Sequence, residues 1–315
     1  MTTSNAGAES APFMSLDWLL LITTAGLWGG SFLFMDIALD SFEPGLVTFV
    51  RVLFGCITLW AIPFDRNRVE TKDRPRIAIL GIVWVAFPLT MFPIAQQWID
   101  SSLTGMLNGG TPIFVALIAI VAFATPPIRI QLTGIAIGLI GVVLIGLPQA
   151  SAAGTTAVGI MLVLLALASY GVAVNIAGPL QRTYGALPVL RRALTVAVVL
   201  TLPYGLIDAT RSSFGWRPLL SCLILGVGGT GIAFVTMATL AGRTGAVRAS
   251  VVTYIIPLVS IALGVGFRGD SLSGWAVLGT VIVLVGARVA TLGSASNKHQ
   301  QPTYAPNAQG ETCQA

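Results

Sequence analysis

The sequence predicts an all-α polytopic membrane protein whose ten transmembrane helices form two inverted five-helix repeats. Three observations predict this fold: an apolar composition, ten apolar segments of membrane-spanning length, and a similarity between the two halves of the chain. Apolar residues make up 55% of the 315 residues and charged residues only 9%, whereas an average soluble domain is about 25% charged. So few charges cannot cover a water-soluble protein of this length, so the lipid bilayer is the expected environment.

Ten apolar segments are long enough to cross a bilayer as helices. A spanning helix needs about 20 mostly apolar residues, because the hydrocarbon core is roughly 30 Å thick. The segments are, in order, residues 17–38, 44–63, 76–98, 102–123, 128–147, 157–179, 187–207, 218–240, 246–267 and 272–292. Their short connections leave no room for a separate soluble domain. We expect the polar ends, residues 1–16 and 293–315, to be disordered cytoplasmic tails.

The positive charges in the connections orient the predicted bundle. With the N-terminus in the cytoplasm, twelve of the 17 Lys and Arg residues fall on the cytoplasmic side and three outside, while Arg51 and Arg288 lie within spans. Cationic segments resist translocation, so we expect both termini on the cytoplasmic side of the plasma (inner) membrane. The net charge of +5 then reflects topology, and no nucleic-acid partner is expected.

Residues that membrane enzymes use are scarce in this sequence. The three cysteines form no CxxC pair, and the single histidine, His299, lies in the C-terminal tail. The sequence has no P-loop, G-x-S-x-G or H-E-x-x-H motif, which are signatures of nucleotide binding, nucleophilic catalysis and zinc chemistry. We therefore expect no enzyme, no cofactor and no metal. A membrane-embedded enzyme without a visible catalytic cluster is the alternative from another class.

The two halves of the chain resemble each other. A shift of 145 residues superimposes the fourth and fifth spans on the ninth and tenth, and places Gly81 over Gly226. We therefore predict two five-helix repeats, residues 17–147 and 157–292. Because five is odd, the second repeat must enter the membrane from the opposite side. Inverted repeats are typical of alternating-access transporters, whose site lies near the midplane between the repeats.

Two matched prolines mark a candidate binding depth. Pro112 falls on Pro257 at the same shift, and each removes the helical hydrogen bond to the carbonyl four residues earlier. Those carbonyls belong to Asn108 and Thr253, which also match. Inside a bilayer a freed carbonyl is tolerated where it faces protein or a watery cavity. The kinks are therefore either satisfied by a neighbouring helix or line a transport cavity, and we favour the cavity.

Three segments resemble a known transporter family. GAVRASVVTYIIPLVSIALGVGFRG (Gly245–Gly269) is similar to the second-repeat signature of the EamA family in the drug/metabolite transporter superfamily, and LWGGSF from Leu27 and PGLVTFVR from Pro44 resemble its opening. The resemblance implies a ten-helix transporter in which helices 1–4 and 6–9 enclose a central cavity and helices 5 and 10 are peripheral. The Gly-Glu pair that the family often carries after the fourth and ninth spans is replaced by Ala124-Thr125 and Gly269-Asp270.

One charge lies deep within a predicted span. Arg51 is about seven residues into the second span, and a central arginine costs about 2.5–3.5 kcal/mol. Asp36, near the outer end of the first span, is its expected partner. The pair either locks the first two helices together or binds a substrate carboxylate. We favour the structural role, because the resemblance implies an arginine here across unlike substrates.

Four charges near span ends have simpler interpretations. Arg191 and Arg192 lie within a turn of the cytoplasmic end of the seventh span, and we expect them to snorkel to the lipid headgroups. Asp17 and Asp270 are at span ends, where solvation at the interface is expected.

Polar and aromatic side chains within the spans are the candidates for substrate contact. Gln96 and Gln97 point about 100° apart on a helix, so at least one must face protein or a cavity. Trp98 is expected in the interfacial aromatic belt. The candidate substrate-binding residues are Trp28, Ser31, Gln96, Asn108, Thr111, Tyr170, Asn175, Thr253 and Tyr254.

Gly134 and Gly138 form a GxxxG motif in the fifth span, which permits close helix contact. We favour contact within the chain over contact between protomers, and expect a monomer or a weak dimer.

The leading hypothesis is a secondary transporter that moves a small amphipathic metabolite by alternating access through a central cavity. The family resemblance adds the direction and the substrate class, an amino-acid exporter. No acid occurs between Trp18 and Met35 of the first span, where small multidrug pumps carry a glutamate, so a drug-cation antiporter of that kind is disfavoured. An exporter of nucleosides or drugs is the alternative within the class. Proton coupling and uniport both stay open.

Overall fold

The part of the chain that the structure describes is helical throughout. It comprises residues 13–63, 69–124, 126–150 and 155–298 of a computed structural model, and its regular elements are α-helices with short 3-10 and π-helical segments. The expected tails lie almost wholly outside these ranges. At the C-terminus the last helix continues to Lys298, past residue 293, where the tail was expected to begin.

The first half of the chain holds the first five predicted spans. Its third span is one continuous rod, Thr71–Ala95, built of 3-10, α- and π-helical pieces. The elements are α1 (Ser15–Leu39), α2 (Pro44–Ala61), η2 (Thr71–Asp73), α3 (Arg74–Leu80), η3 (Gly81–Ala86), α4 (Phe87–Ala95), α5 (Ser101–Asn108), α6 (Thr111–Phe123) and α7 (Arg129–Ala150).

The second half repeats this order. Its eighth span is again a continuous rod, Trp216–Thr244, with a π-helical segment inside it. The elements are α8 (Thr155–Tyr184), α9 (Ala186–Ala209), α10 (Trp216–Leu223), η4 (Ile224–Ile232), α11 (Ala233–Thr244), α12 (Ala246–Ala249), α13 (Val252–Arg268) and α14 (Gly274–Lys298).

The lengths and the outer surfaces of these helices suit a bilayer. Within the described residues, eight helices are long and apolar enough to cross a membrane, and a ninth is gained if α5 and α6 count as one bent span. Helix α13 is apolar but shorter, at 17 residues. Side chains that point away from the bundle are apolar, such as Val121 at 74% exposure and Ile140 at 57%. An outer surface with so many exposed apolar side chains normally contacts lipid or another protein.

The fourth span is broken before Pro112. Helices α5 and α6 meet at an angle of 44° across Gly109 and Gly110. Pro112 lies in the first turn of α6, a position where its missing N–H costs nothing. Pro257, the matched proline, lies inside α13 and is buried against Gly109, where an added Cβ would meet its ring at 2.7 Å. The break in one repeat therefore packs on the proline of the other.

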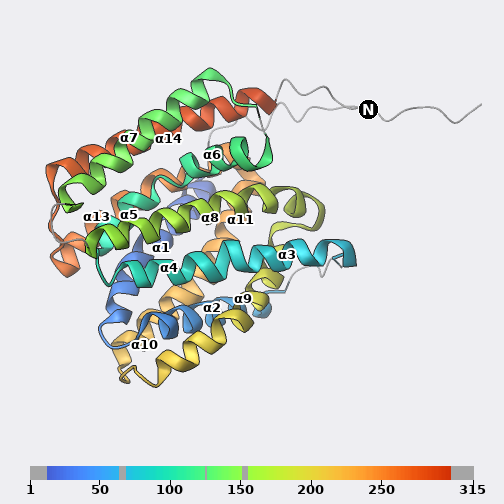
Figure 1. Ribbon diagram of the computed structural model, residues 1–315. Coiled ribbons are helices and arrows are strands. Elements are labelled where there is room, and N and C mark those ends of the chain that lie inside the picture. The colour runs from blue at the N-terminus through green and yellow to red at the C-terminus, as the bar shows by residue number, and fades with distance from the viewer. Residues whose placement is uncertain (1–12, 64–68, 125, 151–154, 299–315) are drawn as a thin grey trace, which may run out of the picture.

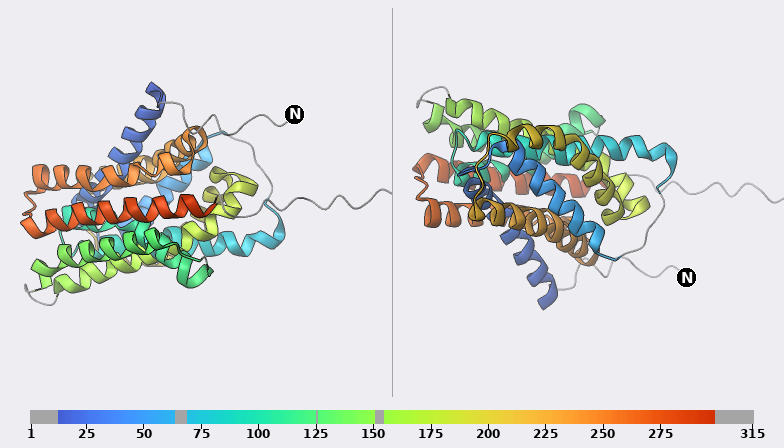
Figure 2. Two further views of the ribbon diagram at one scale, coloured as in Figure 1. Left: turned by 90° about the horizontal axis from the view of Figure 1, so that it is seen from above. Right: turned by 90° about the horizontal axis from the view of Figure 1, so that it is seen from below.

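Helices α7 and α14, the last of each half, form a seam along one edge of the bundle (Figures 1 and 2). Their glycines bring backbone against backbone. A Cβ added at Gly134 or Gly286 would overlap backbone atoms of the opposite helix, and one added at Gly141 would lie 2.6 Å from the amide nitrogen of Val283. The GxxxG motif of the fifth span is thus used for contact within the chain.

The two π-helical segments occupy equivalent places. In one half, a Cβ on Gly81 of η3 would meet the carbonyl of Ala193 and the side chain of Val196 in α9, each at 2.8 Å. In the other, a Cβ on Gly226 of η4 would meet the carbonyl of Arg51 at 2.8 Å and the Cβ of Phe54, three residues later, at 2.5 Å. Each half thus packs a π-helical segment on the second helix of the other half. The contact of η4 includes the backbone of Arg51, whereas alanine, Ala193, stands at the equivalent place in the contact of η3.

Candidate functional site

A buried guanidinium lies two turns into α2. Arg51 is only 7% exposed, and its Nε donates a hydrogen bond of 3.1 Å to the hydroxyl of Thr230 in η4. That hydroxyl donates in turn to the carbonyl of Leu225 at 3.1 Å. Arg51 forms no ion pair with any described residue. The buried cation therefore has a neutral partner where a carboxylate would be usual.

Side chains of α1 and α8 lie around the same part of η4. Nε1 of Trp28 donates to the carbonyl of Gly229 at 3.1 Å, and a Cβ on Gly229 would lie 2.5 Å from the hydroxyl of Ser31. Tyr170 of α8 lies near Arg51. We call Trp28, Ser31, Arg51, Tyr170 and Thr230 the Arg51 cluster. It brings together three of the nine predicted substrate-binding residues and draws on both halves of the chain.

Thr230 is a cluster member that the sequence pattern missed. One visible signal was GVGGTG, residues 226–231, in which a single hydroxyl stands among residues small enough to let α1 and α2 approach. The register could not be anticipated, because Thr230 bonds the carbonyl five residues earlier, as in a π-helix. Such segments occur mostly as single turns inside α-helices and often at functional sites.

The expected pair between Arg51 and Asp36 does not form. Asp36 instead accepts a hydrogen bond from Nε of Arg268, at the end of α13, and Arg268 also pairs with Asp40 at 2.9 Å. The reason is depth. Asp36 lies in the last turn of α1, level with the end of α13, whereas Arg51 lies seven residues into α2, about 10 Å further into the bundle.

The carbonyl of Asn108, at the break of the fourth span, already accepts a hydrogen bond. The hydroxyl of Thr111 donates to the carbonyl of Asn108 at 2.7 Å, so the group that Pro112 frees is bonded within its own turn. Thr253 lies in the first turn of α13, and its amide bonds the carbonyl of Ser250 at 3.0 Å.

Two other candidates tie helices together. Nδ2 of Asn175 in α8 donates to the carbonyl of Val115 in α6 at 3.2 Å. The hydroxyl of Tyr254 lies 3.0 Å from that of Thr291, which joins α13 to α14. Both side chains are bonded to protein as the structure stands, and neither belongs to the Arg51 cluster.

Arg191 and Asp17 are buried, which corrects two expectations. Arg191 is 5% exposed, donates to the carbonyl of Ile62 at 3.1 Å and lies 4.5 Å above the ring of Trp60. It therefore binds the C-terminal end of α2, where a cation is favoured, and does not reach for headgroups. Asp17 is 5% exposed and pairs with Arg243 at 2.6 Å, so it is not solvated. Arg192 donates a hydrogen bond of 3.0 Å to the carbonyl of Pro188 in its own helix.

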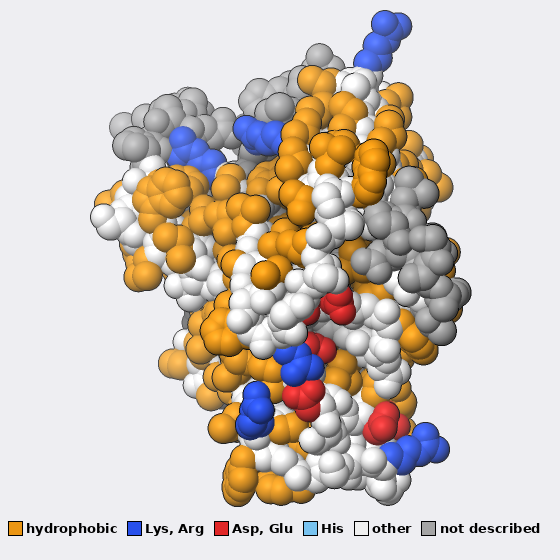
Figure 3. Space-filling model, turned by 90° about the vertical axis from the view of Figure 1, so that its left-hand side faces the viewer, with side chains coloured by type: hydrophobic (Ala, Val, Ile, Leu, Met, Phe, Trp, Pro, Cys, Tyr) orange, Lys and Arg blue, Asp and Glu red, His pale blue; other side chains and the backbone are white. Residues whose placement is uncertain are grey.

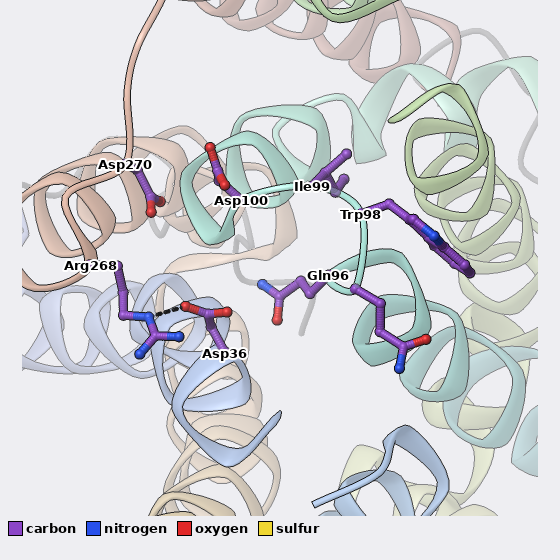
Figure 4. A pocket seen from close by; sticks show the side chains of 8 residues that line it. Asp36, Gln96, Trp98, Ile99, Asp100, Arg268 and Asp270 are labelled. Carbon is purple, nitrogen blue, oxygen red and sulfur yellow. Dashed lines mark hydrogen bonds and ion pairs between the residues drawn. The ribbon is translucent and has the colours of Figure 1, made fainter. Parts of the chain in front are cut away.

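The end of the bundle where α1 and α13 finish is hollowed and charged. Figure 3 shows acidic and basic side chains gathered on this face among hydrophobic ones. A hollow of about 400 Å³ lies between the ends of α1, α4 and α13 and the start of α5. We call it the acidic hollow; it is lined by Asp36, Gln96, Gln97, Trp98, Ile99, Asp100, Arg268 and Asp270 (Figure 4).

The acidic hollow continues into a second hollow of about 410 Å³. Asp36, Gln96, Gln97 and Arg268 line both, and the second adds Asp40, Glu43 and Arg211 among others. Of the predicted substrate-binding residues, only Gln96 lines either hollow. Gln96 is 8% exposed and its Nε2 donates to the carbonyl of Phe32 at 3.1 Å, whereas Gln97 is exposed. Of this adjacent pair, one residue therefore faces protein.

The two aspartates at the rim play different roles. Asp270 accepts hydrogen bonds from the hydroxyl of Ser101 and the amide of Ser102, both at 2.9 Å, and so caps the start of α5. This is not the interfacial solvation expected for Asp270. Asp100 occupies the N-cap position but makes no capping bond with its side chain. Desolvation, and then the nearby carboxylate of Asp270, raise the pKa of Asp100 above its ordinary value of 3.8.

The apolar exterior, the matched halves and the charges held within them define a multi-pass α-helical membrane protein built from a repeat. The chain belongs to the EamA-like transporter family, whose model matches residues 16–147 and 157–292. It is a transporter of this family.

Three known proteins illustrate the similarity. An uncharacterized transporter of Archaeoglobus fulgidus is 24% identical over 85% of this chain and 96% of its own length. A protein of Streptantibioticus cattleyicolor named "Probable terminal-alkyne amino-acid exporter" is 23% identical over 85% of this chain and 91% of its own. A crystal structure with 19% identity superimposes with a TM-score of 0.61 over 92% of this chain and 99% of that one. That last likeness concerns the fold alone.

Proposed function

We propose that this transporter is a secondary exporter of a small amphipathic metabolite, with amino acids as the substrate class, working by alternating access. The name of the Streptantibioticus relative supports the direction and the class. The Arg51 cluster is the proposed place where the substrate carboxylate binds. Trp28, Ser31 and Tyr170 would surround the rest of the substrate. The helix faces along its path through the protein would carry the other candidates: Asn108, Thr111, Asn175, Thr253 and Tyr254.

The observation that carries the proposal is the burial of Arg51 without an acid. A charge inside a membrane protein is costly and usually has a functional partner. Thr230 supplies only one neutral acceptor, to Nε, and an arginine offers five donors in a planar fork that matches a carboxylate. A substrate carboxylate would complete both the charge and the hydrogen bonds of Arg51.

We propose ten spans, with α5 and α6 together as the fourth and α13 as the ninth. Residues 17–147 and 157–292 would be the two inverted units, with both termini in the cytoplasm of a cell whose inner membrane holds the chain. The distribution of Lys and Arg in the connections supports this orientation. The equivalent contacts of η3 and η4 support rocking of one unit against the other, which is the usual motion of inverted-repeat transporters.

Counterflow in proteoliposomes tests the transport proposal. Purified protein is reconstituted with unlabelled L-leucine inside, and uptake of radiolabelled L-leucine is followed. We expect Arg51→Met to lower the exchange rate at least tenfold and Arg51→Lys to restore part of it, because lysine keeps the charge but loses the fork. Arg182→Met, at an exposed position near the end of α8, is the matched control. Exchange by Arg51→Met at the parental rate would exclude Arg51 as the carboxylate site.

A further inference from the structure

We propose that the acidic hollow is a second ligand site, separate from the Arg51 cluster, and that it binds a protonated primary amine. The inference rests on the proposed function only for the source of the amine, which is the amino group of the exported solute. The geometry of the site stands without it.

The charges of the acidic hollow leave it negative. Three carboxylates line it, from Asp36, Asp100 and Asp270, and one guanidinium, that of Arg268. Arg268 is already paired with Asp36 and, through two more hydrogen bonds, with Asp40. A cation in this space would therefore be attracted, although the whole chain carries a net charge of +5.

Asp100 is at the N-cap position of α5 but does not cap the helix with its side chain. An aspartate at an N-cap normally accepts a hydrogen bond from an amide of the first turn. Here Asp270 takes that bond, from the amide of Ser102, and the side chain of Asp100 caps nothing. Figure 4 shows Asp100 and Asp270 together on one side of the acidic hollow. The Asp100 carboxylate thus lines the space with its acceptors open.

The second acceptor is the amide oxygen of Gln96. This side chain is more than nine-tenths buried, and the bond from its Nε2 to the carbonyl of Phe32 fixes the amide. Its Oε1 is buried and has no hydrogen-bond partner among the described residues. Figure 4 shows Gln96 reaching toward Asp36 across the acidic hollow. A buried acceptor without a donor is destabilising, so a donor placed there by a ligand would be favoured.

An ammonium group fits these acceptors better than a metal ion does. It brings three hydrogen-bond donors and one positive charge, which suit a hollow lined by the carboxylates of Asp36 and Asp100 and by the amide of Gln96. No three acidic, histidine or cysteine side chains of the described chain converge as a metal site requires.

Binding of 3-methylbutylamine, the decarboxylated form of leucine, tests the site. The protein is placed in phosphatidylcholine nanodiscs, and affinity is measured by calorimetry at neutral pH beside the uncharged 3-methylbutanol. We expect the amine to bind and the alcohol not to. Asp100→Asn should weaken amine binding at least tenfold. Glu70→Gln is the control: it removes an exposed carboxylate that is paired with Lys72 and lines neither hollow, and it should leave the affinity unchanged.

Gln96→Glu guards against a folding artefact. It keeps the length of the side chain and adds a negative charge next to the ligand, although it gives up the bond from Nε2 to the carbonyl of Phe32. In protein whose melting temperature matches that of the parent, it should strengthen amine binding several-fold, whereas Gln96→Leu should weaken it. Binding should also fade as the pH falls toward the raised pKa of Asp100, and this pH dependence should largely disappear in Asp100→Asn. Asp36, Asp270 and Arg268 line the same hollow, and Asp40 is paired with Arg268 beside it. All four are present in both proteins, which makes the comparison specific.

Two sources could supply the amine, the exported solute or the headgroup of phosphatidylethanolamine. We expect L-leucine to displace 3-methylbutylamine and phosphatidylethanolamine in the nanodisc not to do so; the reverse pattern would name the lipid as the source. Equal affinity of the parent, Asp100→Asn and Gln96→Glu would overturn the site, even if leucine counterflow is intact. Amine binding that depends on Asp100 in a protein without counterflow would overturn the transport proposal and leave the site standing.

Discussion

At the scale of single residues, burial is easier to infer from the sequence than partnership. An arginine seven residues into an apolar segment must be buried, and one of two adjacent glutamines must face protein; Arg51 and Gln96 are both buried. The partner of a buried charge depends on the depth and tilt of helices far apart in the chain. Asp36 therefore pairs with Arg268, 232 residues away, rather than with the arginine just beyond the next loop.

A double-mutant cycle separates these two arginines. Arg51→Ala should lower transport, and adding Asp36→Ala should recover none of it, because the two side chains lie in different clusters and their effects should add within about 0.5 kcal/mol. Arg268→Ala, by contrast, should be partly rescued by Asp36→Ala, since removing one member of a pair leaves the other uncompensated. Leucine counterflow measures the Arg51 comparison, and thermal unfolding of the detergent-purified variants measures the Arg268 comparison. Rescue of Arg51→Ala by Asp36→Ala would show that these two side chains are paired after all, against the structure.

At the scale of elements, hydropathy places the helices but not their internal breaks. Most predicted span limits lie within a few residues of the helix ends, because the need for an apolar, fully hydrogen-bonded segment in lipid is strict. The π-helical segments η3 and η4 are invisible to hydropathy, since residues 224–232 are apolar or glycine apart from Thr230 and would be equally hydrophobic in an α-helix. The hydroxyl of Thr111, which closes the carbonyl that Pro112 frees, was equally unpredictable from the proline alone.

The seam between α7 and α14 makes the glycine pattern testable. Gly134→Ala places a methyl group into the backbone of α14, so it should destabilise the protein by about 1–3 kcal/mol. Gly26→Ala in α1 is the matched control, because nothing lies within 4 Å of the added Cβ; it should be neutral or stabilising by up to about 1 kcal/mol. Melting temperatures in one detergent report both. Similar melting temperatures for the two variants would mean that the seam is looser than described.

The break at Pro112 should matter for motion more than for binding. Pro112→Ala supplies an amide that competes with the Thr111 hydroxyl for the carbonyl of Asn108, and a regained helical bond contributes about 1 kcal/mol. The fourth span should straighten, the protein should melt at a higher temperature, and counterflow should slow several-fold at saturating leucine with little change in half-saturation. A variant that melts and transports like the parent would show that the 44° bend does not depend on the proline.

At the scale of the whole molecule, the repeat was the most informative signal. Matched glycines and prolines 145 residues apart predict two similar halves, and the contacts of Gly81 and Gly226 with the second helices of the opposite halves are related in the structure. What the repeat cannot reveal is where the halves differ. Gly81 meets the carbonyl of Ala193 where Gly226 meets that of Arg51, so the charge of the Arg51 cluster belongs to one side of an otherwise matched pair.

Cysteine labelling tests the proposed orientation. Cys56, Cys222 and Cys313 are first replaced, and single cysteines are introduced at Arg74, at the start of the third span, and at Thr210, at the end of the seventh. A membrane-impermeant maleimide added to intact cells should label the cysteine at residue 210, whereas the one at residue 74 should react only after the membrane is opened, because cationic connections stay in the cytoplasm. Labelling of both in intact cells would exclude the inverted arrangement.

The seam between α7 and α14 would also set the lever arms of the proposed rocking. If the proposed rocking turned about the seam, where backbone packs against backbone at Gly134, Gly141 and Gly286, the seam would be its axis. Displacement about an axis grows in proportion to distance, and α2, α9 and α10 lie at the opposite edge of the bundle (Figure 1). Those helices would then make the widest movements through the surrounding lipid. Lateral pressure in the bilayer would then act on the transport cycle as a mechanical load, felt most at the edge farthest from the axis.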